Sequence, residues 1–284
     1  MGCRRPITLA AVVALSGCAV VVERATLSFA DDLEAAVLDY DEPSVIASGL
    51  PAYLIILEAR VEANPENPAT RLALARLTGA YAGLFAESDQ SRKRLTRRAL
   101  NHARKGACLK QSILCKGDRQ PFEEFEESLA GLGPGDLQAA YVLGTAWAAW
   151  IAAFRDDFGA LADLPKVEAL LKWVAEQDPR HDDGAVWLYL AVLNSQRPPA
   201  AGGRPALALE YYQRALEISR NRNLLVKVFM ADEYARLMFD RDLYVELLED
   251  VLEADPDQPG YRLTNHVAQD RAREMLDNTH QIFD

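Results

Sequence analysis

The sequence predicts an all-α protein, an array of antiparallel helical hairpins similar to tetratricopeptide repeats. Apolar residues recur every three or four positions through most of the chain, the spacing of helices that bury one face. Alternating runs bounded by turn residues, which are typical of strands, are hard to find. Three similar junctions, marked by Asn64, Asp178 and Asp255, each place a proline before a short polar loop and a new apolar pattern. A proline followed by a short loop ends one helix and packs the next against it.

The chain opens on an apolar run, residues 7–22, behind the basic Arg4 and Arg5. Its sixteen residues would make a helix of about 24 Å, which is short of a hydrocarbon core of roughly 30 Å. A basic start and a short apolar stretch are typical of a secretory signal. The motif Leu15-Ser16-Gly17-Cys18 resembles a bacterial lipobox, whose cysteine receives the lipid. We therefore expect three parts: a lipoprotein signal peptide over residues 1–17, a lipidated tether over 18–27 and one helical domain over 28–284.

Helix signals follow one another along that domain. Pro43 suits the first turn of a helix, and Pro51 inside the same stretch predicts a kink or a restart. Polar caps then mark later starts, and the stretch GLGPG at 131–135 marks a break. A short acidic helix opens at Pro121, and Asp182 or Asp183 caps a helix that runs to Asn194. The other expected helices cover 29–40, 43–63, 68–85, 89–110, 137–154, 165–177, 206–219, 223–239, 241–254 and 261–280.

The charge balance is acidic, with 31 Lys and Arg against 42 Asp and Glu and a net charge of −11. This balance disfavours nucleic acid and anionic lipid as electrostatic partners. After the N-terminal run, no second apolar run reaches the 18 or so residues that suggest a membrane span, so we expect membrane attachment through the lipid alone. The basic stretch 90–105 is an exception to the acidic balance. It either forms salt bridges with acidic neighbours or contacts phosphate head groups or an acidic partner.

Cys108 and Cys115 are the cysteines that remain outside the signal and the lipid site. On one unbroken helix their positions would lie about 10.5 Å apart, too far for a disulfide. A turn before Lys116-Gly117 would bring them together, and an oxidising periplasm permits the bond. A disulfide and two buried free thiols both remain open.

No catalytic or metal-binding motif is found. The four histidines are far apart in the sequence, and the spacings of zinc sites, nucleophile elbows and phosphate-binding loops are missing. His181 lies in a polar stretch, where we expect solvent around it. The sequence therefore predicts no enzyme, no metal site and no cofactor.

The stretch 139–154, AAYVLGTAWAAWIAAF, is apolar on nearly every helical face. Such a helix belongs in the centre of a domain, and its aromatic residues either fill the core or line an apolar cleft for an organic ligand. The cleft hypothesis includes two aromatic residues from GAVWLYLAV as well. Its candidate residues are Tyr141, Trp147, Trp150, Trp187 and Tyr189.

Several segments, in order along the chain, resemble the T components of tripartite ATP-independent periplasmic (TRAP) transporters. They are residues 49–85, 139–152, 161–198, 206–219 behind a Gly-Gly turn, and 229–257, with the lipobox in front. The resemblance implies a tetratricopeptide-like periplasmic lipoprotein that partners the substrate-binding P component. It also allows a hydrophobic organic ligand and a homo-oligomer such as a trimer. It transfers no catalytic residue.

The expected function is therefore a scaffold of a TRAP-type solute uptake system, held by Cys18 on the periplasmic face of the outer membrane. The residue after the lipidated cysteine, Ala19, favours the outer over the inner membrane, where Asp is typical. The alternative is a tetratricopeptide-like lipoprotein that serves protein–protein interaction in envelope assembly, without a small-molecule ligand.

Overall fold

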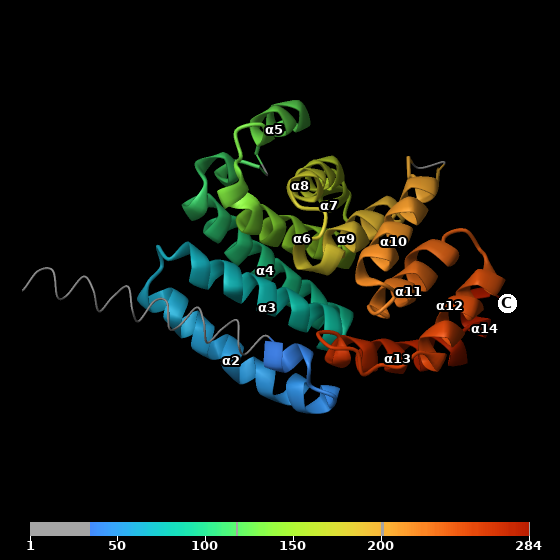
Figure 1. Cartoon of the computed structure of the whole chain (residues 1–284). Helices are drawn as coiled ribbons and strands as arrows, with labels where there is room; N and C mark the ends of the chain where they lie inside the picture. Colours follow the sequence, from blue (N-terminus) through green and yellow to red (C-terminus); the bar gives the residue numbers. More distant parts are fainter. Residues whose placement is uncertain (1–34, 118, 200–201, 284) are drawn as a thin grey trace, which may run out of the picture.

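The computed structural model describes residues 35–117, 119–199 and 202–283, and these residues fold into helices and connecting loops with no strand among them (Figure 1). The all-α prediction is confirmed. The likeness to tetratricopeptide repeats stays a prediction, because the hairpins differ in length and follow no regular period.

Most predicted helices are present within a residue or two of their expected ends. The α-helices are α2 (Pro43–Ala63), α3 (Pro68–Phe85), α4 (Asp89–Lys110), α5 (Phe122–Leu129), α6 (Leu137–Ala153), α7 (Phe158–Leu161), α8 (Leu164–Gln177), α9 (Ala185–Asn194), α10 (Pro205–Ser219), α11 (Leu225–Phe229), α12 (Arg241–Glu253), α13 (Arg262–Asp277) and α14 (His280–Phe283). Short 3₁₀ turns lie at η1 (Ser112–Cys115), η2 (Pro134–Asp136) and η3 (His181–Gly184), and η5 (Met230–Ala235) is a π-helix.

Local chemistry explains where these helices begin. Asn67 accepts a hydrogen bond from the Thr70 amide at 3.1 Å, directly before Pro68 at the start of α3. Ser88 accepts one from the Ser91 amide at 3.2 Å at the start of α4. Each bond satisfies an amide that has no partner within its helix. The prediction of a restart at Pro51 is wrong, since α2 continues through that residue as one helix.

Two other expectations need correction. The helix expected over 223–239 is α11 followed by η5, so its second half is wider than an α-helix. Neither Asp182 nor Asp183 caps α9. Gly184 holds the capping position in a left-handed conformation, and both aspartates also have left-handed backbones with φ of 51° and 52°. Their carboxylates are bonded to tyrosines instead, as described below.

Two apolar cores hold the array together. The first surrounds α6, which packs against α4 on one side and α8 on the other. The second lies among α10, α11, η5, α12 and α13. Glycine allows the close approach at the centre of the first core: a Cβ at Gly144 would lie 2.6 Å from Leu171 Cδ2 on α8.

The array curls until its last long helix meets its first helices, as Figure 1 shows for α13, α2 and α3. The Gly260 amide, just before α13, donates to Asp39 Oδ1 at 2.7 Å, and Arg262 donates to the Asp39 carbonyl at 3.3 Å. Further along α13, Arg271 donates to the carbonyl of Gly83 on α3. These contacts join segments about two hundred residues apart in the sequence.

Helix α2 lies at the outer side of this array and packs mainly on α3 (Figure 1). Leu57 and Val61 pack with Leu74 in a small third core. Among the described residues, α2 is also the one helix long and apolar enough to cross a membrane by length and composition. The sequence does not indicate a span here, because Glu58 and Arg60 end the uncharged stretch before the helix does.

Candidate functional site

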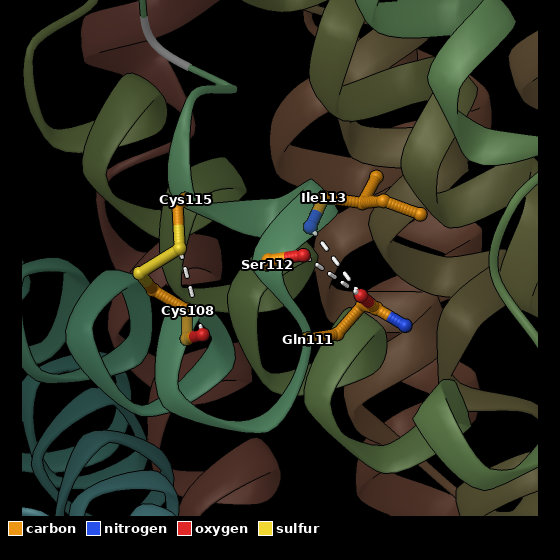
Figure 2. Close-up of a disulfide and its surroundings, with 5 residues drawn as sticks. All are labelled: Cys108, Gln111, Ser112, Ile113 and Cys115. Carbon is orange, nitrogen blue, oxygen red and sulfur yellow. Dashed lines mark hydrogen bonds between the residues drawn. A yellow bond between two sulfur atoms is a disulfide. The ribbon is translucent and has the colours of Figure 1, made fainter.

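The predicted lipid site, Cys18, lies outside the described residues. Cys108 and Cys115 lie in them, and the structure bonds their sulfur atoms to each other across a Cα–Cα distance of 4.3 Å. Figure 2 shows how the chain turns between them: α4 ends at Lys110, and Gln111 accepts from the Ile113 amide at 3.4 Å to start η1. The break in the helix therefore comes between the two cysteines, where the short distance requires it.

The structure places two of the five candidate aromatic residues, Tyr141 and Tyr189, near the same carboxylate, that of Asp182. The Tyr141 hydroxyl on α6 donates to Asp182 Oδ2 at 2.5 Å, and its ring meets the ring of His181 edge-on at 4.8 Å. Burial and the charge of Asp182 hold the pKa of Tyr141 well above its usual value. The same two causes raise the pKa of Tyr189 to about 12. Both hydroxyls therefore stay protonated at neutral pH. His181 is half-buried against Tyr141, unlike the solvated side chain that we expected.

The three tryptophans among the five candidate residues have separate environments. Trp147 is 1% exposed, meets Phe125 edge-on and donates to Asp163 Oδ2 at 3.2 Å. Trp150 packs on Phe154 at the solvent end of α6. Trp187 packs on Tyr211 and donates to the Pro179 carbonyl at 2.9 Å. The shared ligand cleft stays a prediction.

A pocket of about 370 Å³ lies elsewhere, between α5, α8 and the end of α9. Phe122 and Leu164 are apolar residues of its lining, and Glu168, which also lines it, forms ion pairs with Lys172 and Arg204. None of the five candidate aromatic residues lines this pocket. Its acid and base groups largely neutralise one another, so it offers no concentrated charge to a ligand.

The turn His181-Asp182-Asp183-Gly184 joins the first core to the start of α13, a role that no local sequence pattern indicates. Asp182 accepts from Tyr141, which belongs to the first core, as described above. Asp183 accepts from the Tyr261 hydroxyl at 2.7 Å, directly before α13, and lies 3.5 Å from Arg222. Left-handed backbone at a residue with a side chain persists only where surrounding contacts hold it. The sequence signal for this turn is two acids next to a glycine, a pattern that also predicts a helix cap.

A buried acid, Glu233, lies on η5 near the C-terminal end of α9. Glu233 forms an ion pair with Arg155 at 3.2 Å and accepts from Gln196 at 3.3 Å. Burial raises the pKa of Glu233, and the charge of Arg155 opposes that change. These contacts tie the loop after α6 to the end of α9 and to η5.

The basic stretch 90–105 forms most of α4, and both of its sides carry contacts. Arg98 on one side pairs with Glu58 of α2 at 2.5 Å. On the other side, Lys93 and Arg97 lie over the Phe154 ring at 5.5 Å and 4.9 Å. Part of this stretch therefore stabilises the fold, as the salt-bridge interpretation expects.

Within the described residues, no group of three or more His, Cys, Asp or Glu side chains could hold a metal ion. The geometry is that of a helical scaffold with polar junctions between its parts. No curated protein matches the sequence. The family model described as TRAP transporter T-component matches residues 39–283, which is most of the chain and all of its folded core. The chain belongs to the family of TRAP transporter T components.

Proposed function

We propose that this chain is a lipid-anchored periplasmic scaffold that binds the substrate-binding P component of a TRAP transport system and acts by contact, without catalysis. Family membership over residues 39–283 is the observation that carries the proposal. Membership associates the chain with a TRAP system and with the cell envelope. The lipobox at Cys18 adds the anchor, and Ala19 after it favours the outer membrane.

The described fold supports action by contact. The two cores form one curled array closed by the contacts of α13 with α3, and the polar junctions at Asp182, Asp183 and Glu233 are all satisfied within the protein. A rigid body of this kind presents a fixed surface to a partner and loses little freedom on binding.

The anchor is tested with two matched cysteine variants. Cys18→Ala removes the proposed lipid site, and Cys3→Ala changes the other cysteine of the N-terminal stretch. Cells are labelled with a radioactive or clickable fatty acid. We expect the label on the natural chain and on Cys3→Ala, and no label on Cys18→Ala. A labelled Cys18→Ala chain contradicts the anchor.

The partner is tested by pull-down. The mature chain with Cys18→Ser is immobilised, and the P component encoded beside it is passed over, with and without its substrate. A binding protein from an unrelated uptake system is the control. Selective retention supports the proposal. If neither protein is retained, the transport role falls and the envelope-assembly alternative takes its place.

A further inference from the structure

Part of the basic surface of α4 is not used by the fold. Arg98 pairs with Glu58 of α2 at 2.5 Å, but Arg94 and Lys105 are exposed. Within the described residues, no acidic side chain forms an ion pair with Arg94 or Lys105. They lie four residues before and seven residues after Arg98, which places all three on one side of the helix. The basic row, as we name it, consists of Arg94, Arg98 and Lys105.

The positive charge of the basic row exceeds the acid that faces it. Burial lowers the pKa of His102, the charge of Glu58 opposes this, and nearby cations, Arg98 and Lys105 among them, lower it further. Glu62 is the other acid whose charge reaches Arg98. The row thus has three cations against two acids, in a chain whose overall net charge is −11.

The exposed face of α2 adjoins this row. Glu58 of α2 reaches Arg98, and Ile55 lies one turn before Glu58 and points to solvent. Ile55 is 69% exposed and its neighbour Ile56 is 56% exposed. From residue 43 to residue 57 the helix has no charged residue. An uncharged apolar surface therefore lies directly beside a row of cations.

This combination is typical of a surface that lies in a membrane interface. There the apolar side chains enter the boundary between head groups and acyl chains, and the cations stay at the level of the phosphates. Helix α2 has the length and composition of a membrane helix, and only 11% of its apolar window is buried in the protein. A bilayer accepts such a surface without a matching shape, whereas a protein partner needs a complementary one.

We infer that Ile55 and Ile56 of α2, together with the basic row of α4, dock on the head groups of an anionic phospholipid bilayer. The acidic remainder of the chain is repelled by the same bilayer, so docking selects one side of the array. This contact adds to the attachment through the lipid alone that the sequence predicts. Its place in the cell rests on the lipid anchor of the proposed function, which would keep the surface close to a membrane. The binding itself does not depend on that anchor.

Vesicle flotation tests the docking without the anchor. The mature chain with Cys18→Ser is mixed with phosphatidylethanolamine–phosphatidylglycerol vesicles, which are anionic, or with phosphatidylcholine vesicles, which have no net charge. We expect flotation with the anionic vesicles at low ionic strength. Flotation should weaken at about 0.5 M salt, because salt screens exposed charges. It should also be weaker with phosphatidylcholine.

A matched pair of double variants tests the basic row. A cation near an anionic membrane contributes about 1 kcal/mol, or about fivefold in binding. Arg94→Gln with Lys105→Gln should therefore lower the vesicle partition coefficient about 25-fold. Arg214→Gln with Arg273→Gln changes the net charge equally at exposed residues of α10 and α13 and should leave the partition coefficient nearly unchanged. Circular dichroism of both double variants controls for a preserved fold.

A fluorescent probe tests which side of the array meets the lipid. Cys108 and Cys115 are bonded to each other, so a cysteine added to the mature Cys18→Ser chain is its free thiol. An environment-sensitive dye is attached at Ile55→Cys or at Met238→Cys, a 47% exposed residue after η5. With anionic vesicles we expect a blue shift of the emission at position 55 and none at position 238.

Several results overturn the inference. The natural surface fails if the mature chain does not float with anionic vesicles, or floats equally with phosphatidylcholine. The basic row fails if both double variants bind alike, and the face fails if the dye at position 238 shifts as much as the dye at position 55. If nothing floats but the Arg94 and Lys105 double variant loses the P component, the row binds an acidic protein instead. Flotation uses neither the lipid nor the P component, so the inference and the proposed function fail separately.

Discussion

Two glycines inside long helices should respond to alanine in opposite directions. Alanine is favoured over glycine in a helix by about 1 kcal/mol. At Gly79 on α3 a new Cβ would meet Ala99 Cβ at 3.9 Å, an ordinary contact. At Gly144 on α6 the same atom would lie 2.6 Å from Leu171 Cδ2 and 3.0 Å from Leu171 Cγ. Leu171 is fully buried, so it cannot swing into solvent.

These distances set the expected magnitudes. Gly79→Ala should raise the free energy of unfolding by about 1 kcal/mol. Gly144→Ala gains the same propensity but overpacks the core, which costs about 1–3 kcal/mol, so its net effect is a loss of about 1 kcal/mol. The two variants should therefore differ by about 2 kcal/mol, or roughly 4–8 °C in Tm for a domain of this size.

Thermal unfolding of both variants, followed by circular dichroism, measures the difference. Equal helical content at low temperature is the control for a preserved fold. If Gly144→Ala melts at or above the temperature of Gly79→Ala, then α6 and α8 do not approach as closely as described, and the reason given for a glycine in the central helix is wrong.

Three further variants test separate features. Burial raises the pKa of Glu233 above its usual value of 4.5, so the folded state binds more protons than the unfolded state above that pH. Stability should therefore fall as pH rises through this window, and Glu233→Gln should flatten the curve of Tm against pH; an unchanged curve contradicts the assignment. Cys108→Ser opens a loop with a sequence separation of seven and should lower the free energy of unfolding by about 2–3 kcal/mol, as measured by urea titration under oxidising conditions. The same variant should match the natural chain once both are reduced. Arg220 is exposed at the end of α10 with φ of 54°, so Arg220→Gly should raise the free energy of unfolding by up to about 1 kcal/mol. Arg214→Gly, inside α10, should lower it by about the same amount.

The sequence was sufficient for the fold class and for most helix ends, because prolines and polar caps act locally. Asn67 with Pro68 and Ser88 each determine a helix start within one turn of the chain. Pro51 does not restart the helix, because a proline also fits inside a helix when neighbouring contacts hold the helix together, as α3 does for α2.

The contacts between distant elements could not be predicted in the same way. Tyr141 and Asp182 are 41 residues apart, and Tyr261 and Asp183 are 78 apart. No local pattern marks such pairs, whereas an aspartate before an apolar stretch locally predicts a helix cap. The cleft role of the five aromatic residues stays a prediction, because composition alone does not tell which of them share an environment.

The two aspartates in the turn before α9 have a mechanical consequence. Asp182 holds Tyr141 of the first core and Asp183 holds Tyr261 directly before α13, and the two carboxylates belong to adjacent residues, so a displacement of the start of α13 is transmitted to the first core. A partner that binds near α13 would thus act on α6 through two short hydrogen bonds, Tyr261 to Asp183 and Tyr141 to Asp182. We therefore expect α6 and α13 to move together at this turn, so that a displacement at one end of the array changes the position of the other end.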